Sequence, residues 1–346
     1  MPITLGVAQY PTQRTLARTL SLLATVTRKS ALEGINLLVF PEAFLGGYPR
    51  TSTFGSSIGS RTDAGRDEYF AYYSSAVDLG DVDPEGLGVY TGPGDGTRQV
   101  LEDLARETGV FLVVGVVERA GGSLFCACVS VCPQRGLVAK RRKVMPTGAE
   151  RVVWAVGSQK TLKAVEAEIG GEKVVIGAAI CWENYMPLLR TSLYSQGVTL
   201  YIAPTADARE SWIATMQHIA LEGRCFVVGC NQFVTRETLP EYVPGAVEVD
   251  MEDDDDVDGD LEAVAQGEVV CNGGSVVFDP LGNLLAGPMW GTAGVLRAEI
   301  GDVQKAVVRA KMDLDTAVGG HYSRYVHRPP TRRRWTTEEG EEEEHG

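Results

Sequence analysis

The residue best placed for nucleophilic chemistry is Cys181. It follows the apolar and largely β-branched run 173–180, which predicts a buried strand, and it precedes a helical pattern beginning near Met186. Unpaired N–H groups and the dipole at a helix start lower the pKa of a nearby thiol, so we expect a solvent-facing Cys181 with thiolate character. For this residue alone, a small buried side chain in the core is the alternative.

A carboxylate and an amine follow other predicted strands. Glu42 comes just after an apolar strand pattern, where open α/β sheets place their chemistry. Lys143 ends the basic run 140–143 and leads into a Pro-Thr-Gly turn, with Glu150 seven residues beyond it. Taken singly, Glu42 could be a solvated turn acid and the basic run a solvated face. Glu150 could likewise be a surface partner of Arg151.

Taken together, these segments resemble the three signatures of the carbon–nitrogen hydrolase (nitrilase) superfamily. The matching stretches are Phe40-Pro-Glu42, Arg142-Lys143-Val-Met-Pro-Thr147 and Ala179-Ile-Cys181-Trp-Glu-Asn184. The similarity extends through further segments and covers the chain from Ile3 to about Tyr322. Within the superfamily, the pattern is similar to the true nitrilase branch of plant and related microbial enzymes.

The resemblance implies a catalytic role for each reactive residue. Cys181 would attack the nitrile carbon to give a covalent thioimidate and then a thioester. Glu42 would act as the general base, Lys143 would stabilise the developing negative charge, and Glu150 would be a fourth catalytic residue that holds Lys143 or water. The products would be a carboxylic acid and ammonia, with some amide released.

Two other activities remain alternatives at this point. An amidase or carbamoylase of the same superfamily would use the same residues with a different pocket. A non-catalytic scaffold that recruits basic partners through its acidic segments is a third interpretation.

Several further residues are assigned to the pocket or its surroundings. Tyr48 and Trp182 are expected to bind substrate as parts of the pocket wall. Asp207 is interpreted as a helix cap and His218 as a packed histidine, whereas Arg50 could meet an anionic substrate or face water. No residue selects among β-cyanoalanine, arylacetonitriles, aliphatic nitriles and dinitriles.

Composition limits the other possibilities. No apolar run in the 346 residues is long enough to cross a bilayer, and the first residues lead directly into a strand pattern without a secretory signal. Seven cysteines without zinc-type pairs favour a reducing, cytoplasmic location, and Cys126, Cys128 and Cys132 are interpreted as core residues. Neither a metal nor a cofactor is expected.

The net charge of −14 is concentrated in two segments. Ten acidic residues lie within 248–262 and six within 338–344, and without them the chain carries about +2. We therefore expect an acidic loop at about 246–264 and a charged tail at 326–346, both solvated. Nucleic-acid binding is not expected, because the one late basic run lies beside the acidic tail.

Strand and helix patterns alternate along the chain, which favours an α/β layered fold. The resemblance sharpens this to a four-layer αββα sandwich in a single domain, residues 1–325. It also implies a homodimer or a larger homo-oligomer or spiral. The segment from Tyr48 to about Asp95 is expected to be a lid or pocket wall. The main expected strands are 4–10, 35–40, 110–117, 124–131, 173–180, 199–203, 226–234, 275–278 and 294–299, and the expected helices lie near 16–26, 97–107 and 210–221.

Overall fold

The computed structural model describes residues 2–80, 93–244, 246 and 267–317. The expected acidic loop, apart from Ala246, and the expected tail lie outside the described residues. Within the described chain the α-helices are α1 (Leu16–Leu32), α2 (Asp63–Ser75), α3 (Thr97–Thr108), α4 (Pro187–Tyr194), α5 (Glu210–Gly223) and α6 (Val303–Ala317). Four short 3₁₀ turns are η1 (Gly148–Val152), η2 (Gln159–Thr161), η3 (Cys181–Tyr185) and η4 (Arg236–Thr238).

Two large β-sheets form the centre of the described chain. The first has the strand order β15-β1-β2-β5-β6-β7. Its strands are β1 (Ile3–Gln9), β2 (Leu37–Val39), β5 (Phe111–Ala120), β6 (Ser123–Cys132), β7 (Gly136–Arg142) and β15 (Gly294–Ile300). Strands β1, β2 and β5 are parallel neighbours, and β6 and β7 continue the sheet as antiparallel hairpins.

The second sheet has the order β12-β13-β11-β10-β9-β8, with β14 also paired to β13. Its strands are β8 (Val165–Ile169), β9 (Glu172–Ala178), β10 (Leu200–Pro204), β11 (Phe226–Cys230), β12 (Phe233–Thr235), β13 (Val269–Phe278) and β14 (Leu284–Trp290). A small separate hairpin joins β3 (Ser56–Ser57) and β4 (Ser60–Arg61).

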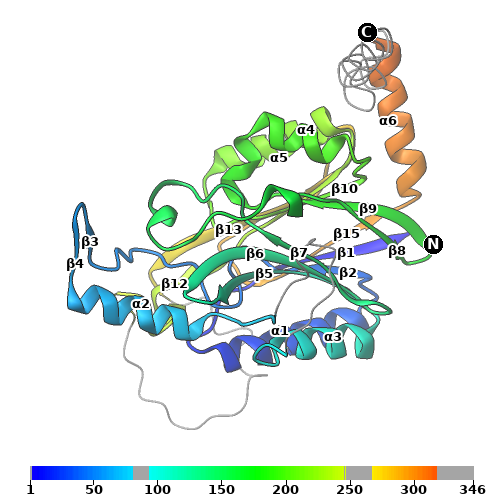
Figure 1. Ribbon diagram of the computed structural model, residues 1–346. Coiled ribbons are helices and arrows are strands. Elements are labelled where there is room, and N and C mark those ends of the chain that lie inside the picture. Colours follow the sequence, from blue (N-terminus) through cyan, green and yellow to red (C-terminus); the bar gives the residue numbers. More distant parts are fainter. Residues whose placement is uncertain (1, 81–92, 245, 247–266, 318–346) are drawn as a thin grey trace, which may run out of the picture.

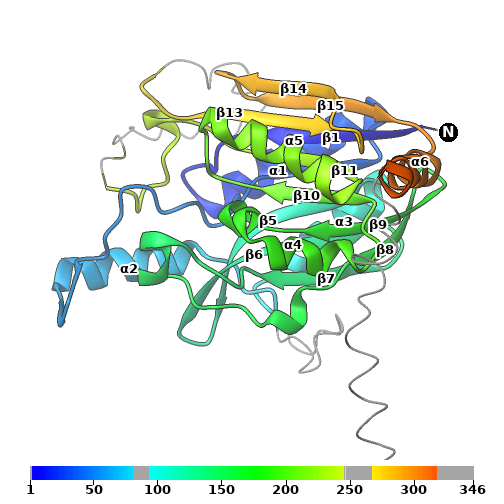
Figure 2. The same ribbon diagram turned by 90° about the horizontal axis from the view of Figure 1, so that it is seen from above.

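The sheets pack face to face between two layers of helices, and the expected αββα sandwich is confirmed (Figure 1). Helices α1 and α3 cover the first sheet, α4 and α5 cover the second, and α6 extends along one end (Figures 1 and 2). One apolar cluster lies between the sheets and includes Val39, Cys126 and Ile202. Separate clusters lie beneath α1 and α3 and beneath α4 and α5, so both faces of each sheet are buried.

Most of the expected elements are confirmed, and the differences have local causes. The expected strand 226–234 is divided into β11 and β12, which both pair with β13, because the ladder is interrupted at Asn231 and Gln232. Both side chains are buried, and the Asn231 N–H donates to the Ser275 hydroxyl and not to a strand carbonyl. Strands β7, β8 and β14 were not among the expected elements. In β7, the basic residues obscured the strand pattern because their charges are paired inside the protein.

The segment that follows Tyr48 contains structure that was not expected. Helix α2 carries Tyr72, whose side chain is fully buried and whose hydroxyl donates to the Gly47 carbonyl. The Trp154 indole N–H in turn donates to the Tyr72 hydroxyl at 3.0 Å. This part of the segment therefore belongs to the core and supports the loop that carries Tyr48; residues 81–92 lie outside the described chain.

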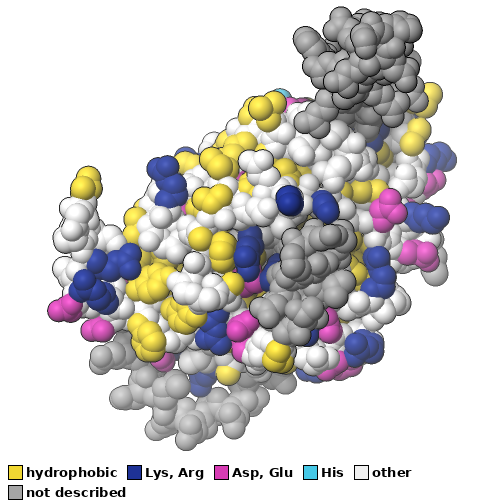
Figure 3. All heavy atoms as spheres, viewed as in Figure 1, with side chains coloured by type: hydrophobic (Ala, Val, Ile, Leu, Met, Phe, Trp, Pro, Cys, Tyr) yellow, Lys and Arg dark blue, Asp and Glu magenta, His cyan; other side chains and the backbone are white. Residues whose placement is uncertain are grey.

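On the molecular face in Figure 3, basic and acidic side chains of the described residues are interspersed. Among the described helices, none combines the length and the apolar character that a membrane span requires.

Candidate active site

Four side chains of the candidate site lie just beyond strand ends in the two sheets. Glu42 follows β2 and Lys143 follows β7 in the first sheet, while Cys181 follows β9 and Thr205 follows β10 in the second. The sheets face each other, so these ends lie close together although the residues are far apart in sequence. The sandwich thus brings together the three reactive residues predicted from the sequence.

Lys143 links two carboxylates in the interior. Its Nζ lies 2.8 Å from Oε1 of Glu42 and 2.7 Å from Oε2 of Glu150. Glu42 and Lys143 have no exposed surface, and Glu150 is also buried. Glu150 is therefore a partner of Lys143 and not a surface partner of Arg151, which was the alternative from the sequence.

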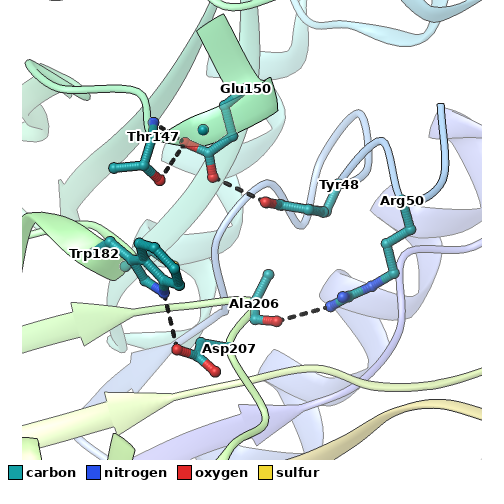
Figure 4. A pocket seen from close by; sticks show the side chains of 9 residues that line it. Tyr48, Arg50, Thr147, Glu150, Trp182, Ala206 and Asp207 are labelled. Atoms are coloured by element: carbon teal, nitrogen blue, oxygen red, sulfur yellow. Dashed lines mark hydrogen bonds between the residues drawn. The ribbon is translucent and has the colours of Figure 1, made fainter. Parts of the chain in front are cut away.

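Two further groups hold Glu150 in place. The Tyr48 hydroxyl donates to its Oε1 at 2.9 Å, and the Thr147 backbone N–H donates to its Oε2 at 2.8 Å (Figure 4). Glu150 lies in η1, and its side chain caps the start of that turn. These contacts fix the carboxylate that orients the Lys143 amine.

The Cys181 thiol is buried, and the expectation of a solvent-facing thiolate is wrong for the free protein. Cys181 opens η3 with φ of 51°, and α4 begins only at Pro187, so no α-helix starts at the thiol. Burial raises the pKa of the Cys181 thiol, and the charge of Glu42 raises it further. Lys143 and a hydrogen bond with Thr205, whose Oγ1 lies 3.2 Å from the sulfur, act in the opposite direction.

The same burial perturbs the other charged groups. Desolvation raises the pKa of Glu42, although the Lys143 charge opposes this effect. Desolvation favours neutral Lys143, yet the surrounding acidic groups, led by Glu42, raise its pKa well above the usual value. Within the described chain, Oε2 of Glu42 has no partner of ordinary hydrogen-bond geometry, although the Cys181 thiol lowers the pKa of this carboxyl as a weak donor. The site therefore combines a thiol whose pKa is raised by burial, a buried carboxyl group whose Oε2 can accept a proton, and an amine whose pKa is raised by the acidic groups around it.

A cavity of about 270 Å³ opens above Cys181. Its lining residues are Tyr48, Arg50, Thr147, Gly148, Glu150, Cys181, Trp182, Ala206 and Asp207 (Figure 4). Both expected wall residues, Tyr48 and Trp182, thus line the cavity. Arg50 donates from Nη2 to the Ala206 carbonyl at 3.1 Å and lies over the Tyr48 ring.

Two interpretations from the sequence are wrong, those of Asp207 and His218. Asp207 lines the cavity and accepts a hydrogen bond of 2.9 Å from the Trp182 indole, whereas the N-cap of α5 is Arg209. His218 is not packed, since 67% of its side chain is exposed and its nearest charged partner is Glu222. The periodicity of a sequence does not distinguish an acidic residue in a loop that faces a cavity from an acidic residue that caps a helix.

Sequence reasoning also missed two residues of the site. Thr205 contacts the sulfur, and Glu183 lies fully buried between the segments that carry Lys143 and Cys181. A search for polar residues just past the β10 pattern would have found Thr205. Glu183 lies within the Cys-Trp-Glu signature, but only the fold shows what its carboxylate binds. Within the described residues, no group of three or more His, Cys, Asp or Glu side chains is arranged to hold a metal.

Comparison with known proteins identifies the family. The profile of the carbon-nitrogen hydrolase family matches residues 4–308, and the chain belongs to this family. An aliphatic nitrilase from Sinorhizobium fredii is 42% identical over 90% of this chain and 88% of its own length. An arylacetonitrilase from Trametes versicolor is 43% identical over 89% of each chain, and the bifunctional nitrilase/nitrile hydratase NIT4A of Nicotiana tabacum is 42% identical over 91% of this chain and 80% of its own.

The fold has also been observed in a solved structure. An amidase from Nesterenkonia sp. aligns with a TM-score of 0.59 over 91% of this chain and 95% of its own, at 17% identity. At this identity the comparison supports the shared fold only.

Proposed function

We propose that the protein is a nitrilase that converts a nitrile and two waters into a carboxylic acid and ammonia, with Cys181 as its nucleophile. The observation that carries the proposal is the buried thiol beneath a cavity, beside a carboxylate and a cation that are bonded to each other. The relatives over most of the chain are named as nitrilases, which favours nitriles over amides as substrates. The alternatives from the sequence, an amidase or carbamoylase and a non-catalytic scaffold, are not favoured by these relatives.

The reaction begins from a neutral thiol. Because burial raises the pKa of Cys181, the thiolate forms as Glu42 accepts the proton during attack on the nitrile carbon. The negative charge that develops on the nitrile nitrogen lies near the Lys143 ammonium, which is already held by Glu42 and Glu150. Glu42 returns the accepted proton to that nitrogen, which gives a neutral thioimidate and restores the base.

Two waters complete the reaction. The first adds to the thioimidate carbon, and loss of ammonia from the tetrahedral intermediate leaves a thioester on Cys181. The second, activated by Glu42, releases the carboxylic acid and restores the thiol. Expulsion of the thiol from the first intermediate would instead release the amide.

Substitution of Cys181 and Glu42 tests this proposal. Cys181→Ala, Cys181→Ser and Glu42→Gln should all fold and lose turnover. When catalytic residues act as a unit, removing one of them lowers the rate about as much as removing all of them. Acid and amide release from a panel of nitriles and the matching amides, followed by mass spectrometry, provides the measurement. If Cys181→Ala kept even about a tenth of wild-type turnover, the nucleophile would be another group. Turnover of amides without nitriles would favour the amidase alternative.

We also propose one catalytic domain over residues 1–325 in a cytoplasmic homo-oligomer. Seven free cysteines support a reducing compartment. Light scattering of the purified protein would measure the oligomeric state.

A further inference from the structure

Glu183 binds the backbone on both sides of the candidate site. Its Oε1 accepts a hydrogen bond from the Val144 N–H at 2.7 Å, and its Oε2 accepts one from the Ile180 N–H at 2.8 Å. Val144 follows Lys143 directly, and Ile180 directly precedes Cys181. One carboxylate therefore joins the end of β7 in the first sheet to the end of β9 in the second.

We propose that Glu183 is a positioning residue that fixes the separation between the Lys143 amine and the Cys181 sulfur. The inference rests on the proposed function, because it assigns a role within that site. None of the hydrogen bonds of Glu183 involves the sulfur or the amine, so it acts through the two backbone segments. The attack requires a near-attack arrangement, and a shift of about 1 Å in either group can cost about 100-fold in rate.

A carboxylate is required at this position because all the neighbouring groups are donors. Besides these two backbone N–H groups, the Met145 N–H donates to Oε1 at 3.4 Å and Arg141 Nη2 donates to Oε2 at 2.6 Å. The Glu183 side chain has no exposed surface. A glutamine would turn its amide N–H₂ toward at least one of these donors and lose that bond. It would also leave the buried Arg141 guanidinium without its counter-charge, since Nε and Nη1 of Arg141 have no partner within the described residues.

Glu118 provides a matched control. It is another buried carboxylate that pairs with the same basic run, where it binds Lys140 and Arg142. It does not line the cavity above Cys181. Glu118→Gln therefore removes a comparable buried charge without touching the connection between the two reactive segments.

The experiment compares Glu183→Gln, Glu183→Asp and Glu118→Gln with the wild type in the full-length protein. Two rates are measured on folded protein. The first is the alkylation of Cys181 by iodoacetamide at neutral pH, which mass spectrometry of the Cys181 peptide detects. The second is steady-state nitrile turnover. Because the free thiol has a raised pKa, alkylation at neutral pH depends on proton transfer to Glu42 and so reports the site geometry without a nitrile. Thermal unfolding of each variant measures the general cost of the lost charge.

The positioning role predicts that Glu183→Gln slows alkylation and lowers kcat by about 10- to 100-fold with little change in KM. Glu118→Gln should lower the melting temperature and keep both rates per folded molecule. If Glu183→Gln does not fold, Glu183→Asp decides, because its shorter carboxylate keeps the charge but cannot span both backbones unchanged. Wild-type rates in a folded Glu183 variant, or equal losses in the Glu118 control, would overturn the inference. Absence of nitrile turnover in the wild type would refute the proposed function instead, and the alkylation comparison would still test the positioning role.

Discussion

Lys140 and Lys143 lie three residues apart, and their side chains face opposite sides of the first sheet. Lys140 pairs with Val129 of β6 and Arg141 with Cys128, so the basic run alternates between the helix-covered face and the space between the sheets. Both lysine side chains are buried and both contact carboxylates. Burial alone therefore does not distinguish the structural lysine from the one in the site.

The difference lies in the surrounding charges. Burial lowers the pKa of Lys140, and although Glu118 opposes this effect, the positive charge of Arg142 adds to it. Around Lys143, Glu42, Glu150 and two cysteines all favour the charged form, so its pKa is raised despite burial. An excess of acidic groups keeps the Lys143 cation charged where a negative charge is proposed to develop.

The largest expected effect is the difference in nitrile turnover between variants of the two lysines. Lys143→Met should lower nitrile turnover by about 100- to 1000-fold, because it removes the cation at the developing charge. Lys140→Met should keep kcat per folded molecule and lower the free energy of unfolding by about 1–3 kcal/mol, because Glu118 loses a buried partner. Kinetics and urea unfolding of both variants provide the measurements. Equal losses of turnover would remove the distinction between the two faces.

The pH dependence tests the carboxylate bonded to Lys143. Glu42 must be ionised to accept the thiol proton, and burial raises its pKa. Activity should therefore fall as the pH drops through this raised value, which places the acidic limb of kcat/KM above the ordinary glutamate value of 4.5. Circular dichroism at each pH serves as the control for unfolding. A limb at or below 4.5 in folded enzyme would mean that the Lys143 charge dominates over burial.

A smaller effect is expected from the hydroxyl beside the sulfur. Thr205→Val removes a hydrogen bond that lowers the pKa of Cys181, so alkylation at neutral pH should slow by about threefold to tenfold. Thr199→Val is the matched control, because Thr199 precedes the same strand at its other end and accepts from the Val175 N–H. A similar slowing in both variants would indicate a general loss of packing.

The smallest effect is expected from Arg142, on the helix-covered face of the first sheet. Arg142→Gln removes a guanidinium that is 25% exposed and leaves Lys140 bonded to Glu118. The free energy of unfolding should fall by about 1 kcal/mol, with nitrile turnover unchanged. Urea unfolding beside Lys140→Met gives the comparison. A larger loss in Arg142→Gln than in Lys140→Met would make Arg142 the main partner of Glu118.

The strands that carry the site were predictable because buried apolar runs have a strong local pattern. The runs before Glu42 and Cys181 form β2 and β9 in the structure, close to their expected positions. Strand β7 was missed because Lys140 to Lys143 resembles a solvated surface until their carboxylate partners are known. Those partners, Glu118 in β5 and Glu183 in η3, lie in segments distant in sequence, so no local pattern contains them.

The order of the amino acids alone was enough to predict which residue types follow the strands and, through three motifs, the family of the chain. Only the three-dimensional fold shows that Thr205 contacts Cys181, that Tyr48 binds Glu150 and that Glu183 binds the Val144 N–H, because these contacts join segments distant in sequence. The fold also raises the pKa of Cys181, because desolvation depends on what covers a group in three dimensions.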